Sequence, residues 1–250
     1  MNSPTQTNRP DKKKHRLSVA VGLWIIKRIE ALLIRFSTVP DTPFLSAGDF
    51  SWVAYLEENA ATIRKELDVL LTQPEKIPNF QDISTDQTNL TKDDKWKSFF
   101  LYGYGYKMEN NCKLCPQTTA MVEKIPGMFT AFFSVLSAGK HIPLHRGPYK
   151  GLLRGHLALI VPQPAADCWI EVGGEKSSWS EGKCIVFDDT YQHRVENNTD
   201  GLRVVLFLDI LRPLRFPGSW LNRLVLQLIR LSPFIQDARR NQRAWEKAYD

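Results

Sequence analysis

The sequence contains few cysteines and few histidines, and these scarcities limit what the protein can be. Four cysteines in 250 residues cannot make a disulfide framework, so we expect free thiols in a reducing compartment. Cys112 and Cys115 form one CxxC motif, but no second CxxC follows to complete a zinc site. Three of the five histidines lie together in HIPLHRGPYKGLLRGH, between His141 and His156. This clustering makes the stretch a candidate functional region.

The sequence also lacks an apolar run long enough to cross a bilayer. The segment 17–36 follows a basic stretch, but its uninterrupted apolar part, residues 17–26, is about half of the roughly 20 residues that a span needs. KRIE stands where a signal peptide would have small residues and a cleavage site. Two interpretations stay open: an amphipathic helix on a membrane surface, or a helix packed on the domain.

Acidic residues do not balance the basic ones. The chain has 33 Lys and Arg against 27 Asp and Glu, a formal charge of +6, and the excess lies in KKKHR near the start and ARRNQRAWEK near the end. Such ends favour peripheral contact with an anionic membrane, and solvated tails are the alternative. Basic and aromatic residues do not interleave as they do in nucleic-acid grooves, so we expect no nucleic-acid partner.

Hydrophobic patterning divides the chain into four parts. We predict a disordered basic arm and an amphipathic helix in 1–40, and a helical N-terminal part of the main domain in 41–127. In 128–214, six or more short segments rich in β-branched, aromatic or leucine residues are separated by turn sequences such as SEGK and NNTDG. No helical pattern interrupts them, which indicates an antiparallel sandwich or jelly roll. Helices are predicted again in 215–250.

Alternation along the predicted strands places several polar residues on one face. Arg154 and His156 share a face with Ala158 and Ile160, because side chains two apart on a strand point the same way. Arg203 shares a face with Val205 and Phe207, and Ser134 shares one with Phe132 and Leu136. If these faces line the interior, two arginines are buried without an acidic partner, which is costly. An anion is therefore expected there, and a dicarboxylate suits forked guanidinium donors.

The histidines allow a metal site beside this anion pocket. Non-haem Fe(II) oxygenases commonly use two histidines and a carboxylate, but Gly147 stands two residues after His145, where that carboxylate is usual. A His-x-Gly site leaves a position open to water or halide, and Asp188 and Asp189, just before His193, could bind that water. The alternative is that these histidines are ordinary polar residues of a sheet.

The same residues carry a family resemblance. HIPLHRGPYKGLLRGHLALIVP and WSEGKCIVFDDTYQHRVENNTDGLRVVLFLDILRPL resemble the aspartyl/asparaginyl β-hydroxylase family, and most of all its bacterial lipid A acyl-chain hydroxylase branch. The similarity also includes WxxF at Trp96 and NNC at Cys112. It implies a mainly β fold, with a double-stranded β-helix core between N- and C-terminal helices. It also implies an Fe(II)- and 2-oxoglutarate-dependent dioxygenase that consumes O2.

The resemblance assigns roles position by position. It implies that His145 and His193 bind the iron and that Asp189 lies near the iron-bound water; the family likewise lacks the usual carboxylate. The residues that match co-substrate contacts are Trp96, Ser134, Arg154, His156 and Arg203. His141 receives no role and is interpreted as a rim residue.

The substrate implied is a lipid A-type acyl chain, with peptidyl aspartate or asparagine as the alternative. A non-enzymatic jelly-roll binding module is a third possibility, and a halogenase is a minor one that His-x-Gly would allow. Together with the basic ends, a lipid substrate leads us to expect a cytoplasmic protein in peripheral contact with the cytoplasmic face of the membrane.

Overall fold

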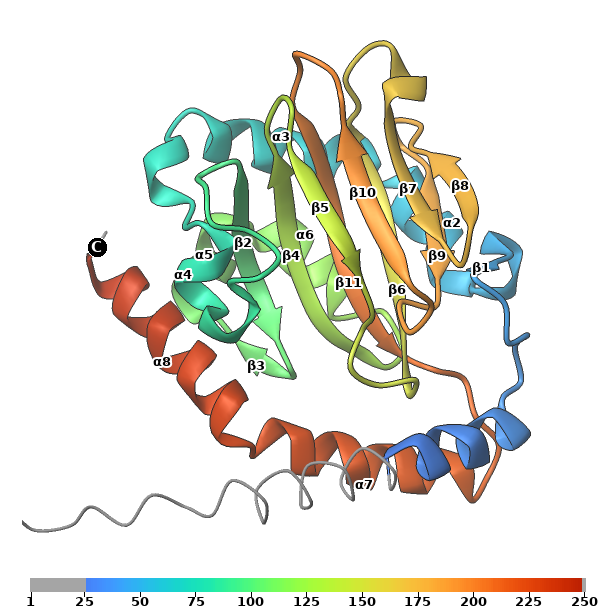
Figure 1. Ribbon diagram of the computed structural model, residues 1–250. Coiled ribbons are helices and arrows are strands. Elements are labelled where there is room, and N and C mark those ends of the chain that lie inside the picture. The colour runs from blue at the N-terminus through green and yellow to red at the C-terminus, as the bar shows by residue number, and fades with distance from the viewer. Residues whose placement is uncertain (1–25, 249–250) are drawn as a thin grey trace, which may run out of the picture.

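The computed structural model describes residues 26–248, and its centre is a pair of antiparallel sheets packed face to face (Figure 1). The larger sheet has the order β1-β9-β6-β11-β4-β2-β3, and the smaller has the order β5-β10-β7-β8. The strands of the larger sheet are β1 (Phe44–Leu45), β2 (Trp96–Gly103), β3 (Tyr106–Lys107), β4 (Met128–Leu136), β6 (Leu152–Ile160), β9 (Cys184–Phe187) and β11 (Arg203–Leu211). Those of the smaller sheet are β5 (His141–His145), β7 (Cys168–Val172), β8 (Glu175–Ser178) and β10 (His193–Asn197).

This architecture confirms the predicted jelly roll. Strands β4 to β11 all lie within 128–214, and only the short 3-10 helix η4 (Ala165–Asp167) interrupts them. The larger sheet also takes β1, β2 and β3 from 41–127, so that part of the chain is not wholly helical as predicted. Its helices are η1 (Ala47–Asp49), α2 (Ser51–Glu58), α3 (Ala60–Leu71), η2 (Pro74–Lys76), α4 (Phe80–Ile83), η3 (Thr85–Gln87), α5 (Glu109–Leu114) and α6 (Pro116–Val122). The domain boundaries themselves stay a prediction.

Both faces of the larger sheet are covered, and neighbouring residues of one strand join different cores. On β4, Phe133 packs in a cluster with α2 and α3, whereas Phe132 packs between the two sheets. Ala158 and Val205 also lie between the sheets, as alternation predicts. Ile160 packs on the helix side instead, beyond a register shift between Val204 and Val205 in the pairing of β11 with β6.

Helices close one end of the two sheets. Residues 26–36 form a helix, and α7 (Gly218–Arg230) runs beside it before α8 (Pro233–Ala248) continues along the larger sheet (Figure 1). Leu33 and Leu226 are buried in one cluster between these helices and the sheet end. The described part of the predicted amphipathic helix therefore packs on the domain, while the predicted basic arm and the rest of that helix lie outside the described residues. No helix within 26–248 is both long and apolar enough to span a membrane.

Candidate active site

Two histidines face each other across the edge of the smaller sheet. His145 ends β5 and His193 begins β10, and the two are direct partners in the antiparallel register, with ring centroids 4.0 Å apart. Nδ1 of His145 lies 2.8 Å from the carbonyl oxygen of Pro143, and Nδ1 of His193 lies 2.9 Å from that of Tyr191. A carbonyl only accepts, so each Nδ1 carries the proton and each Nε2 keeps its lone pair. This is the tautomer that a metal ligand needs.

Burial keeps both imidazoles neutral. It lowers the pKa of His193 to about 3, with the proximity of His145 and Arg154 adding to the effect, and it also lowers the pKa of His145. Neutral imidazole is the form that binds metal. Within residues 26–248, no third His, Cys, Asp or Glu joins them in a cluster able to hold an ion. The pair thus fits a metal held by two imidazoles with further positions left for other ligands.

Asp189 occupies the space beside Gly147. The Gly147 N–H donates to the carbonyl oxygen of Asp189 at 2.7 Å, and a Cβ added to Gly147 would come within 3.0 Å of the Asp189 carboxylate. Burial raises the pKa of Asp189 to about 6, with the proximity of Arg154 opposing this shift. The position that His-x-Gly seemed to open to a halide is therefore bordered by a carboxylate, which disfavours the halogenase interpretation.

Arg154 is not the unpaired charge that the sequence suggested. Its Nη2 lies 2.9 Å from Asp189 and its Nε lies 3.0 Å from Asp209, while its guanidinium stands 4.3 Å from the centre of the Phe207 ring. The prediction of two unpaired arginines is wrong for this one. Asp209 was missed, although alternation on β11 places it on the same face as Arg203 and Phe207. Contact of Arg154 with a co-substrate stays a prediction.

Arg203 does have the predicted environment. Its side chain is 1% exposed, its guanidinium lies 4.8 Å from the Trp179 ring centre, and Nη1 donates to the carbonyl oxygen of Ser134 at 3.4 Å. Nε has no hydrogen-bond partner, and no carboxylate of the described residues pairs with the guanidinium. Burial lowers the pKa of Arg203 to about 10. An anionic ligand here would supply the missing acceptors.

The other predicted residues join this pocket. Both ring nitrogens of buried His156 are without hydrogen-bond partners, and burial lowers the pKa of His156 well below its usual value. Trp96 donates from Nε1 to Oγ of Ser134 at 3.1 Å and stacks on Phe80. Seven predicted site residues line one cavity: Trp96, Ser134, His145, Arg154, His156, His193 and Arg203.

A second cavity continues from the first. The two share Trp96, His145, Arg154 and Phe207, so His145 stands where they meet, while His193 lines the first cavity. One wall of the second cavity is apolar and includes Phe80, Leu90, Phe100 and Phe132, whereas other lining residues, such as Thr130 and Asp209, are polar. Pattern reasoning did not find this wall, because it combines α4, the loop before β2, and two strands that only the fold brings together.

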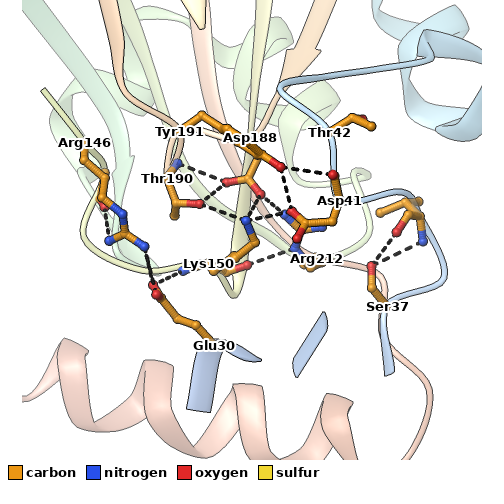
Figure 2. A network of polar contacts seen from close by, with 12 residues as sticks. Glu30, Ser37, Asp41, Thr42, Arg146, Lys150, Asp188, Thr190, Tyr191 and Arg212 are labelled. Carbon is orange, nitrogen blue, oxygen red and sulfur yellow. Dashed lines mark hydrogen bonds and ion pairs between the residues drawn. The ribbon is translucent and has the colours of Figure 1, made fainter. Parts of the chain in front are cut away.

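A polar network joins the loop that follows His145 to the loop that precedes His193, through residues such as Lys150 and Asp188 (Figure 2). Glu30 receives Arg146 Nη2 at 2.8 Å and the N–H of Lys150 at 3.0 Å. Lys150 Nζ reaches Asp41 at 2.7 Å and Asp188 at 3.2 Å. The network ties the helix of residues 26–36 to the loop that directly follows His145.

Asp188 belongs to this network and not to the pocket. It pairs with buried Arg212 and accepts the Thr190 N–H at 3.0 Å, so the suggestion that it holds a metal-bound water is wrong. Asp189 keeps that suggested role as a prediction. His141 is half exposed and pairs with Glu196 at 2.6 Å, as a rim residue would. All four cysteines are buried and free.

Fold and site together define a jelly-roll protein whose central pocket combines two metal-competent imidazoles with a buried, unpaired guanidinium. The chain belongs to the aspartyl/asparaginyl β-hydroxylase family, whose model matches residues 57–213. The resemblance seen in the sequence is thereby confirmed, and with it membership of a hydroxylase family.

Curated relatives include a lipid acyl hydroxylase and proteins named for aspartyl or asparaginyl hydroxylation. An ornithine lipid ester-linked acyl 2-hydroxylase of Rhizobium tropici is 43% identical over 90% of this chain and 80% of its own length. The human aspartyl/asparaginyl β-hydroxylase is 28% identical over 69% of this chain, which spans 21% of that protein. Human aspartate β-hydroxylase domain-containing protein 2 is 32% identical over 70% of this chain, which spans 48% of it.

Proposed function

We propose that the protein is an Fe(II)- and 2-oxoglutarate-dependent dioxygenase that hydroxylates an unactivated C–H bond in an acyl chain of a membrane lipid. One observation carries the co-substrate: buried, unpaired Arg203 opens on the same cavity as His145 and His193. A dicarboxylate with one end at Arg203 and the other at the histidines would satisfy both groups.

The described residues fit the metal and the co-substrate. His145 and His193 would hold the iron through Nε2, because each Nδ1 is already occupied. Bound Fe(II) would supply the oxidising chemistry: O2 and 2-oxoglutarate are consumed, succinate and carbon dioxide leave, and one oxygen atom enters the substrate as hydroxyl. Arg203 and Ser134 would hold the far carboxylate, while Arg154 and His156 would steady the near end.

The remaining protein groups orient and exclude water. Asp189, held by Arg154 at 2.9 Å, would accept a hydrogen bond from a metal-bound water. Trp96 fixes the hydroxyl of Ser134, and Phe187 and Phe207 pack against His156. An apolar surround of this kind strengthens the polar contacts that a bound anion makes.

Two observations support a lipid acyl chain as substrate. The 43% identical relative, aligned over 90% of this chain, is named for an ester-linked acyl chain, and the apolar wall of the cavity beside His145 offers contacts that such a chain could make. The lipid A-type chain suggested by the sequence and an ornithine lipid chain belong to the same substrate class. The proposed place of action is the cytoplasmic face of a membrane, in peripheral contact with it.

Peptidyl aspartate or asparagine is the second candidate, because the family and its human members are named for that reaction. These relatives share less identity with the chain than the lipid hydroxylase does. A non-enzymatic binding module is disfavoured, since binding alone gives no reason to combine two neutral, metal-competent imidazoles with the Arg203 pocket.

Mass spectrometry of membrane lipids tests the proposal, comparing cells that have this gene, lack it, or carry His145→Ala. We expect one added oxygen on an acyl chain with the wild-type gene and none with the variant. Fractionation of lipid A from aminoacyl lipids shows which chain carries it. Unchanged lipids with iron-loaded protein present would reject the lipid substrate, and a hydroxylated Asp or Asn in the proteome would support the second candidate.

A further inference from the structure

A row of large apolar side chains is exposed along α7 and at its two ends. Phe216, Trp220, Leu224, Leu228 and Leu231 are between 44% and 80% exposed. Their spacing of three or four residues keeps the members within α7 on one side of the helix. Single exposed apolar residues are ordinary, but a continuous row marks a surface that contacts something else. These five residues are called the α7 row below.

The α7 row cannot turn inward, because the opposite side of α7 is fixed. Leu226 is buried in the cluster that also holds Leu33, and buried Asn222 donates from Nδ2 to the carbonyl oxygen of Gly151 at 2.8 Å. At Gly218, a Cβ would come 2.6 Å from Cβ of Phe36, so the helix of residues 26–36 lies directly against α7. Both helices therefore form one rigid layer.

The charge around the α7 row has one sign. No Asp or Glu stands between Asp209 and Asp237, while Arg215 and Arg223 are exposed. The neighbouring helix exposes Lys27 and Arg35. Its one acidic residue, Glu30, is buried against Arg146. An apolar row on a helix that exposes only basic charges complements an anionic, apolar surface, as a membrane interface provides.

The layer lies at the end of the jelly roll that carries the histidines. In Figure 1, α7 and the helix of residues 26–36 run below the point where β5 ends and β10 begins. The loop directly after His145 rests on this layer, through Glu30 with Arg146 and through Asn222 with Gly151. A surface seated on α7 would therefore face the histidine end of the molecule.

We propose that α7 and the helix of residues 26–36 form a docking face for an anionic phospholipid bilayer, with the α7 row inserted at the boundary between headgroups and acyl chains. Phe216 and Trp220 suit that boundary, where aromatic side chains are enriched. The inference rests on the proposed function for its meaning, since docking would hold the enzyme at the membrane that contains its proposed substrate. Its test depends on neither iron nor co-substrate.

Sedimentation with vesicles tests the docking face, using the iron-free full chain without 2-oxoglutarate. We expect binding to phosphatidylcholine vesicles that contain phosphatidylglycerol, weaker binding without it, and weakening by salt. Trp220→Ser with Leu228→Ser should bind at least about tenfold more weakly, because two large apolar groups no longer enter the interface. Arg223→Glu should lose affinity mainly for the anionic vesicles.

The matched control is Val69→Ser with Leu114→Ser, which removes two apolar side chains of comparable exposure on α3 and α5. It should bind like wild type, and circular dichroism should show every variant folded. The inference is overturned if the wild-type protein does not bind anionic vesicles, or if the Trp220→Ser, Leu228→Ser double variant binds them as well as wild type does. It is also overturned if light scattering shows a dimer that this variant dissociates, because a second copy would then cover the row. Vesicle binding with unchanged lipids in cells would reject the acyl substrate and keep the docking face.

Discussion

The carboxylate of Asp189 fills the space that a side chain on Gly147 would need. A Cβ at residue 147 would lie within 3.0 Å of that carboxylate, although the two residues are far apart in sequence and meet through a 2.7 Å hydrogen bond from Gly147 N–H to Asp189 C=O. Residue 147 therefore carries no carboxylate of its own, and the carboxylate of Asp189, from the loop before His193, lies in that space instead.

Gly147→Asp should not create a better metal site. The added carboxylate would overlap Asp189 and place two negative charges side by side, so we expect the free energy of unfolding to fall by about 1–3 kcal/mol or more. Chemical denaturation measures this, with Gly48→Ala as control, because a Cβ there meets nothing nearer than 3.6 Å. Adding Asp189→Gly should recover part of the loss. A Gly147→Asp variant as stable as wild type would show that the Asp189 carboxylate does not exclude a side chain at residue 147.

The buried charge of Arg203 should lower the free energy of unfolding when no ligand is bound. Burial lowers the pKa of Arg203 from 12.5 to about 10, so the fold disfavours the charged guanidinium, and the cost is fully present below pH 10. Arg203→Met should raise the free energy of unfolding by up to about 3 kcal/mol and abolish 2-oxoglutarate binding.

Melting temperatures with and without 2-oxoglutarate check this, on protein loaded with a redox-inert metal. The co-substrate should raise the Tm of wild type and leave that of Arg203→Met unchanged. Arg194→Met is the control, because Arg194 pairs with Glu171 on the outer side of the smaller sheet at 3.0 Å and should keep the response. If 2-oxoglutarate raised the Tm of Arg203→Met as much as that of Arg194→Met, Arg203 would not be a binding residue for the co-substrate.

Strand alternation predicted much of the pocket from the sequence. It placed Ser134, His156 and Arg203 on inward faces correctly, because side chains alternate strictly along unbroken strands. It misplaced Ile160, which lies beyond the register shift at Val204 and Val205, and such a shift has no signature in composition. The contact between Gly147 and Asp189 depends on how two loops pack, which no local pattern encodes.

Strand β2 shows the same limit for the fold. Its residues are buried on both faces over most of its length, so it lacks the alternation that identifies a half-exposed strand. The sequence WKSFFLYG therefore gives no clear strand signal, and it lies within a part predicted to be helical. Asp209 is a different kind of miss, since its position two residues after Phe207 was visible in the sequence.

Replacing His193 and replacing His141 should have very different effects on iron binding, although both residues lie on the paired strands β5 and β10. His193→Ala removes a proposed iron ligand that lines the pocket, so iron affinity should fall by at least about tenfold and iron-dependent succinate formation should be lost. His141→Ala removes a half-exposed residue paired with Glu196 and should leave both unchanged. Iron titration and succinate assays check the pair. Wild-type succinate production by His193→Ala would contradict the ligand assignment.

Glu30 should act as a positioning residue, because it holds the loop after His145 without touching the pocket. Glu30→Gln weakens the contacts to Arg146 and to the Lys150 N–H, so we expect a loss of about 1–3 kcal/mol in the free energy of unfolding. Iron affinity should fall by about tenfold, as when an outer partner of a metal ligand is removed.

Glu196→Gln provides the matched control for Glu30. Glu196 also contacts a residue of β5, but that residue is His141, at the end of the strand away from the pocket. Its replacement should leave iron affinity at the wild-type value, measured by the same titration. If Glu30→Gln loses stability and keeps full iron affinity, the helix of residues 26–36 supports the fold alone. If both fall together, the layer that carries the α7 row also sets the geometry of the histidine pair.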